Sequence, residues 1–208
     1  MTATTMGSAA TRAGGFYVWM AGVVALVAFG GFAGTYWLQL PAGTFNGAGI
    51  VHLHGLLFSA WTVLFFSQTR LGANRNLAAH RTWGVVGVAL ATAMVCVGMA
   101  VAIRAVPIGV AAGWEVGAKA IFLTSVSAMA LFAGYVAAAL LNVRRPEWHK
   151  RLMLSAAILI VMGPGIGRLP IAPPTLGGFT VQLLFALVLF VPMFIWDRRS
   201  QGKVHPAT

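Results

Sequence analysis

The sequence contains few acidic residues, since Asp and Glu together number three against 14 Lys and Arg. This scarcity argues against a transporter that moves protons along a relay of buried carboxylates. It also disfavours non-haem iron and zinc sites, because these usually combine histidine with carboxylate or cysteine ligands. The one cysteine, Cys96, excludes an intrachain disulfide and any cluster of cysteine ligands.

Familiar catalytic motifs are absent from the sequence as well. The chain has no phosphate-binding loop, nucleophile elbow or zinc-protease motif. The glycine-rich segment 163–167 lacks the lysine and the preceding strand of a nucleotide-binding loop. No catalytic residue is identified on this basis.

Apolar residues dominate the composition instead. Hydrophobic residues make up 59% of the chain and charged residues 8%, which is too little polar surface for a soluble domain of this length. A helix needs about 20 apolar residues to cross a bilayer, and six stretches meet or approach that length. They are 16–40, 49–68, 82–103, 120–141, 151–167 and 176–196. The composition therefore predicts an all-α, polytopic membrane bundle with six transmembrane helices.

Basic residues are distributed unevenly between the loops that join these stretches. Eleven of the 14 lysines and arginines fall before the first stretch or around the ends of the second, fourth and sixth. The other three, Arg104, Lys119 and Arg168, fall on the opposite side. Because basic loops stay in the cytoplasm, both termini are expected to be cytoplasmic. The net charge of +11 thus reflects topology in a lipid bilayer and does not indicate a nucleic-acid partner.

No linker or low-complexity tract divides the chain. We therefore expect a disordered head over residues 1–14, one six-helix transmembrane domain over 15–199 and a disordered tail over 200–208. His205 lies in that tail, and no role is expected for it. A weak internal repeat is also visible, because a basic loop leads into a helix at His80-Arg81 and again at His149-Lys150-Arg151.

Four of the five histidines lie in or beside the apolar stretches. A titratable side chain at membrane depth is costly and is usually retained for a function or a partner. The predicted topology separates these histidines into an outer pair, His52 and His54, and an inner pair, His80 and His149. Because a helix of about 20 residues is about 30 Å long, the two pairs cannot bind one ion.

The outer pair cannot point to one centre from a regular helix, because residues two apart lie about 200° apart around it. His54, Trp61 and Gln68 recur at every seventh position and share a face that is expected to point into the bundle. Arg168 follows a segment broken by proline at the same end and is expected to close a cluster with His54. The predicted outer polar cluster comprises His52, His54, Trp61, Gln68, Arg168 and Gln182. The alternative is an interfacial histidine that bonds to a carbonyl or hydroxyl group.

The inner pair occupies matching positions at the starts of two helices, so the two rings are expected to approach each other across the bundle. Two facing imidazoles are the axial ligands that a b-type haem requires, and Arg81, Lys150 and Arg151 could pair with its propionates. His80 and His149 are therefore the predicted metal ligands, with Arg81 and Arg151 as further cofactor-binding residues. The alternative is that both histidines, which lie among basic residues, face lipid headgroups.

Several short motifs are distributed along most of the chain. They are His54-Gly55 with Phe58-Ser59 and Trp61, then His80-Arg81, His149 through Met153, and Arg168-Leu169-Pro170. This pattern resembles an uncharacterised family of small bacterial six-span membrane proteins, to which no reaction is assigned. The resemblance implies a multi-pass protein of the bacterial inner, or cytoplasmic, membrane. A more distant analogy is to small membrane b-type cytochromes.

These observations favour an inner-membrane protein that binds a b-type haem or a similar redox cofactor through His80 and His149. Its expected role is electron transfer or the support of a respiratory complex. Two alternatives stay open. One is a non-catalytic membrane subunit or assembly partner, and the other is a protein that binds a quinone or another lipid near His54, Trp61 and Arg168.

Overall fold

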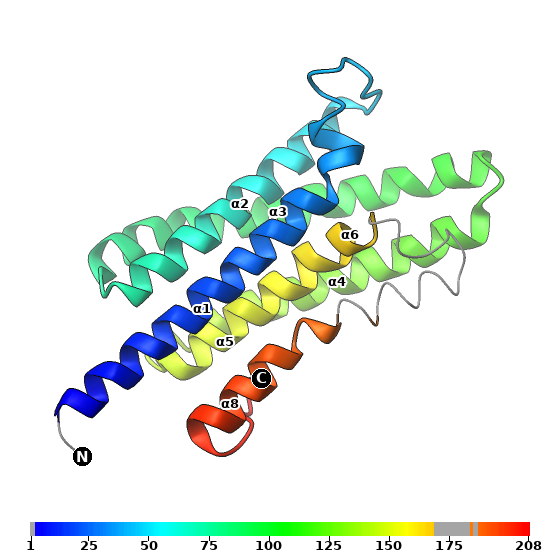
Figure 1. The fold of residues 1–208 in the computed structure, drawn as a ribbon. Helices are drawn as coiled ribbons and strands as arrows, with labels where there is room; N and C mark the ends of the chain where they lie inside the picture. Colours follow the sequence, from blue (N-terminus) through cyan, green and yellow to red (C-terminus); the bar gives the residue numbers. More distant parts are fainter. Residues whose placement is uncertain (1–2, 169–183, 185–186) are drawn as a thin grey trace.

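The computed structural model describes residues 3–168, 184 and 187–208 (Figure 1). These described residues form helices joined by short loops and contain no strand, which confirms the all-helical prediction. Four of the helices are long and apolar enough to cross a membrane, as expected of an integral membrane protein. They are α1 (Ala3–Gly31), α2 (Gly49–Ala73), α3 (Leu77–Ala111) and α4 (Glu115–Leu141).

The second half of the chain is more broken. Helix α5 (Pro146–Ala157) continues through a π-helical segment, η2 (Ile158–Met162), into the short helix α6 (Gly163–Ile166). This composite helix overlaps the predicted fifth stretch. About half of the predicted sixth stretch falls outside the described residues, and α8 (Val191–Gln201) covers only its end. Six spans and cytoplasmic termini therefore stay predictions.

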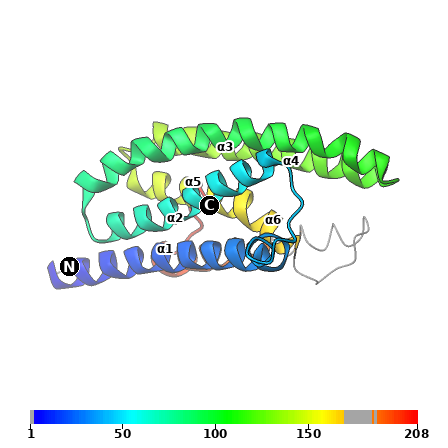
Figure 2. The ribbon, with the colours of Figure 1, turned by 90° about the horizontal axis from the view of Figure 1, so that it is seen from above.

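Five helices form a closed ring in which each contacts the next, because α5 returns to pack on α1 (Figures 1 and 2). Seen from above, helices α3 and α4 lie along one side of the molecule and α1 lies along the other (Figure 2). Two hairpins, α2–α3 and α4–α5, therefore lie within the ring. They correspond to the two halves of the weak sequence repeat.

The core of the ring is made of large apolar side chains. Met20 of α1, Met94 of α3 and Phe132 of α4 are completely buried. Trp61 of α2 lies among them, with its ring stacked 5.5 Å from Phe65 and edge-on at 5.2 Å to Phe132. Such aromatic pairs add to the apolar contacts that hold the helices together.

The main chains of α1 and α6 approach each other closely where α1 ends. A Cβ atom on Gly31 would overlap the main chain of Gly165 in α6, and one on Gly165 would lie 2.7 Å from the carbonyl oxygen of Val27. Small residues permit this kind of contact between membrane helices. Beyond it, Ala33–Trp37 form a second π-helical segment, η1, and Arg168 follows α6.

Helical structure extends into both terminal segments. Helix α1 begins at Ala3, within the expected head. At the other end α8 continues to Gln201, and Gly202, with a φ of 74°, reverses the chain. Residues 203–208, which we call the strap, fold back onto the bundle, and Ala207 is buried there.

Candidate functional site

Two histidine rings lie close together, with nearly perpendicular planes, where the two hairpins meet. His80 of α3 and His149 of α5 have ring centroids 6.2 Å apart and planes inclined by 84°. We call the end of the bundle that contains these rings the inner end. Their residues are far apart in sequence, and the closure of the helical ring brings them together.

Both histidines occupy the same position in their helices. Asn76 caps α3 with its side chain, and its carbonyl accepts from the His80 N–H at 3.0 Å. Arg145 precedes α5, and its carbonyl accepts from the His149 N–H, also at 3.0 Å. Pro146 begins α5, where its fixed φ suits the first turn. Each histidine therefore lies four residues after the N-cap residue of its helix, Asn76 or Arg145.

Each ring is also anchored to the preceding helix of its own hairpin. His80 Nδ1 lies 3.3 Å from the carbonyl oxygen of Gln68 in α2, and His149 Nδ1 lies 2.9 Å from that of Ala139 in α4. A carbonyl oxygen only accepts hydrogen bonds, so each Nδ1 must carry the proton. In the neutral ring Nε2 then keeps its lone pair. A main-chain carbonyl that orients a histidine in this way is characteristic of metal-binding histidines.

Gln68 belongs to this inner site, although the sequence grouped it with His54. Its side-chain Nε2 donates to the carbonyl oxygen of His80 at 3.0 Å, while its own carbonyl accepts from the His80 ring. Fourteen residues of helix separate it from His54, which corresponds to about 21 Å. Gln68 therefore holds both the main chain and the ring of His80.

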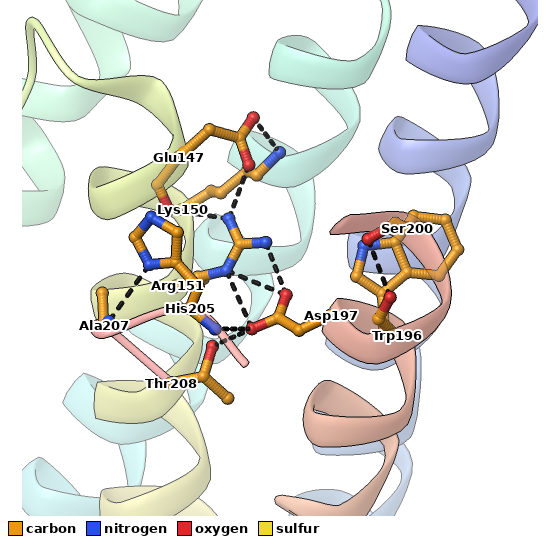
Figure 3. Close-up of polar contacts among 9 residues, drawn as sticks. All are labelled: Glu147, Lys150, Arg151, Trp196, Asp197, Ser200, His205, Ala207 and Thr208. Carbon is orange, nitrogen blue, oxygen red and sulfur yellow. Dashed lines mark hydrogen bonds and ion pairs between the residues drawn. The ribbon is translucent and has the colours of Figure 1, made fainter. Parts of the chain in front are cut away.

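A buried ion cluster lies beside His149 (Figure 3). The Arg151 side chain is completely buried. Its Nε and Nη2 donate to Asp197 Oδ1 at 3.1 and 2.5 Å, and its Nη1 donates to Glu147 Oε2 at 2.5 Å. Lys150 also binds Glu147, at 2.6 Å. Two of the three acidic residues of the chain thus surround one arginine.

The carboxylates of this cluster stay ionised. Burial by itself would raise the pKa of Asp197, but hydrogen bonds from Arg151, Thr208 and the His205 N–H lower it overall. Partial burial by itself would also raise the pKa of Glu147. Hydrogen bonds from Lys150 and Arg151 outweigh this effect, so the pKa of Glu147 is lowered as well. A buried arginine with two paired carboxylates avoids the cost of an isolated charge.

This cluster changes the expected role of Arg151. The sequence suggested that its guanidinium could pair with a haem propionate, whereas in the structure it is bound to Asp197 and Glu147. Arg81, beside His80, is exposed and is the better placed of the two for a propionate. Asp197 was not among the residues that the sequence predicted for this site. Its only signal was the rarity of acidic residues.

The other end of the bundle, which we call the outer end, contains His52 and His54. The Nδ1 of His52 lies 3.1 Å from the hydroxyl of Tyr36 in η1, and the His52 ring packs edge-on against Phe45 at 5.0 Å. The ring of His54 instead stacks on Phe58 at 4.0 Å. Its Nδ1 is buried and has no hydrogen-bond partner among the described residues. The two histidines thus face different surroundings.

Arg168 lies at the same end as His54. Its guanidinium is 4.2 Å from the centre of the Phe32 ring and close enough to His54 to act on it electrostatically. Trp61 is part of the apolar core, and Gln182 lies outside the described residues. Of the predicted outer cluster, Arg168 and His54 therefore lie at the same end of the bundle, while Gln68 lies with His80.

Comparisons with protein-family models, with curated proteins and with solved structures find no match for this chain. The resemblance to a family of six-span bacterial proteins therefore stays a prediction. Among the described residues, no three His, Cys, Asp or Glu side chains are grouped so that they could hold a metal ion. The arrangement that bears most directly on function is the pair of neighbouring histidine rings at the inner end.

Proposed function

We propose that this membrane protein binds a b-type haem between His80 and His149 and serves electron transfer or the support of a respiratory complex. The observation that carries the proposal is the pair of rings whose Nδ1 atoms are both bound to main-chain carbonyls. This arrangement leaves Nε2 of each ring as the free ligand atom.

The separation of the rings suits a single metal. An imidazole nitrogen binds a metal ion at about 2 Å, and the ring centre lies about 1 Å further away. Two imidazoles on opposite sides of one ion therefore have centres about 6 Å apart. The observed separation is 6.2 Å. An inclination of 84° is compatible with two such ligands if both ring planes contain the axis through the metal, because each ring can then take any angle about its bond to the metal.

The number of protein ligands favours haem over a bare ion. Zinc and non-haem iron need three or four protein ligands, and this site offers two histidines. A porphyrin supplies four nitrogen ligands of its own, so two axial imidazoles complete the coordination of its iron. With both axial positions filled by protein, the haem suits electron transfer. Arg81 would pair with a propionate.

The test is the absorbance spectrum of the protein purified in detergent, with and without dithionite, together with iron analysis. We expect a Soret band that shifts on reduction. His80→Ala and His149→Ala should each abolish or strongly alter it. His52→Ala is the matched control, because it removes a histidine at the outer end and should leave the spectrum unchanged.

A rescue experiment sharpens this test. His149→Gly removes the whole ring, and added imidazole should restore the spectrum if the ring is a ligand. A folded, colourless protein without iron, produced by cells supplied with haem, would contradict the proposal. That outcome would favour the alternative of a non-catalytic membrane subunit or assembly partner.

A further inference from the structure

The strap, residues 203–208, is held on the buried ion cluster by one carboxylate oxygen. Asp197 Oδ2 accepts from the His205 N–H at 3.0 Å and from the Thr208 hydroxyl at 2.6 Å. The other oxygen of Asp197 is bound to Arg151 (Figure 3). Arg151 Nε also reaches Oδ2, at 3.4 Å. Asp197 therefore joins the strap to the bundle through one carboxylate.

The strap also reaches the residue that orients His149. Ala207 is only 7% exposed and forms a small apolar cluster with Ala139 and Leu152. Ala139 is the residue whose carbonyl oxygen accepts from His149 Nδ1. The docked strap thus covers the support of one of the two facing histidines. Displacement of Ala207 would expose that support to solvent.

A hydrogen bond within the strap, which helps to place Ala207, requires one protonation state of His205. The Ala207 N–H donates to His205 Nδ1 at 3.1 Å, so this nitrogen must carry a lone pair. Protonation would place a hydrogen on Nδ1 and remove the acceptor. The His205 ring lies edge-on to Trp148, with centroids 5.3 Å apart.

The surroundings of His205 also disfavour its proton on balance, although the two nearby carboxylates oppose this effect. It is close to two cations, Arg151 and Lys150, and to two carboxylates, Asp197 and Glu147. Burial, followed by the positive charge of Arg151, lowers the pKa of His205 below its ordinary value of 6.5. Because the docked state disfavours the proton, docking is complete above about pH 6.5 and weakens as the pH falls.

We propose that the strap is a pH-sensitive latch over the inner end. It is docked while His205 Nδ1 accepts from Ala207, and it is released when that nitrogen is protonated. Release uncovers Ala139 and so loosens the orientation of His149. The latch would regulate the two-histidine site, and this consequence rests on the proposed function, whereas the movement of the strap does not.

Thiol labelling can follow the strap without any cofactor. Cys96 is the only cysteine, so Cys96→Ser gives a clean background into which Ala207→Cys is introduced. Lys203→Cys, at an exposed position of the same segment, is the matched control for the pH dependence of the thiol reaction. The measurement is the rate of reaction with N-ethylmaleimide in detergent, given as the ratio of the two variants.

We expect this ratio to rise by up to about tenfold between about pH 8 and pH 5.5, as a released histidine with an ordinary pKa takes up its proton. His205→Gln should keep the ratio low at both values, because an amide oxygen can accept from Ala207 and does not titrate. Asp197→Asn should raise the ratio at both values.

Two results would overturn the latch. One is a ratio that does not change with pH, and the other is a pH dependence that persists in His205→Gln. Neither depends on haem. A colourless protein would contradict the proposed function and leave the labelling result intact, so the two failures can be distinguished.

Discussion

At the inner end of the bundle, Arg151, Asp197 and both histidine rings are held by hydrogen bonds. At the outer end, the buried Nδ1 of His54 has no such partner among the described residues. The inner end is also regular helix on both hairpins, whereas η1 and the proline-containing segment after η2 interrupt the outer end. Preorganised rings with oriented lone pairs suit a tightly held cofactor. The outer end is therefore less suited to hold a cofactor in a fixed position.

Removing the carboxylate of Asp197, at the inner end, should cause the largest loss of stability. Asp197→Ala leaves a completely buried arginine with only Glu147 as its partner. We expect a loss of about 3 kcal/mol in stability, near the lower end for a broken buried pair. Thermal unfolding in detergent would measure it. The double variant Arg151→Leu/Asp197→Leu should recover most of the loss, because it leaves no buried charge. An unchanged melting temperature in Asp197→Ala would show that the pair is not buried inside the protein.

A methyl group at the crossing of α1 and α6 should disturb the outer end next. In Gly31→Ala the new Cβ would overlap the main chain of Gly165, and overpacking of this kind costs about 1–3 kcal/mol. Gly30→Ala is the matched control, since a Cβ there meets nothing within 4 Å. The comparison is the difference between the two melting temperatures. Equal values would mean that the two helices do not approach so closely.

Arg168 should contribute less than Asp197, because the contact of a guanidinium with the face of an aromatic ring is weaker than a buried ion pair. Arg168→Ala loses the contact with Phe32 at 4.2 Å, for which we expect about 1 kcal/mol. Arg168→Lys should restore only part of it, because an ammonium group lacks the planar guanidinium that stacks on a ring. Both variants are compared with the parent by thermal unfolding, and three identical melting curves would remove Arg168 from the outer cluster.

The smallest expected effect has the opposite sign. His54→Phe keeps a ring that can stack on Phe58 and removes a buried nitrogen without a described partner. Replacing such a group by an apolar one of similar shape is nearly neutral or stabilising, by about 1 kcal/mol at most. His52→Phe is the control and should be destabilising, because it removes the contact with the Tyr36 hydroxyl. A clear loss of stability in His54→Phe would indicate that the His54 ring has a hydrogen-bond partner, which would then belong to the outer cluster.

Much of the helical architecture could be predicted from local sequence. Apolar runs predicted the four long helices that the structure contains, although α3 extends well beyond the expected 82–103 at both ends. The matching positions of His80 and His149 were visible because a basic loop precedes each of them. The grouping of Gln68 with His54 was less successful, since a seven-residue spacing identifies a face of a helix and not a depth along it.

The sequence by itself determined that the chain forms apolar helices and that two histidines start equivalent helices, because both properties follow from local composition and spacing. Only the tertiary structure decided which groups meet. Asp197 reaches Arg151 across 46 residues of sequence, and the strap reaches Ala139 from still further along the chain. Contacts of this kind depend on how the helices close into a ring. That closure is set by the packing of side chains from every helix at once, which no local pattern encodes.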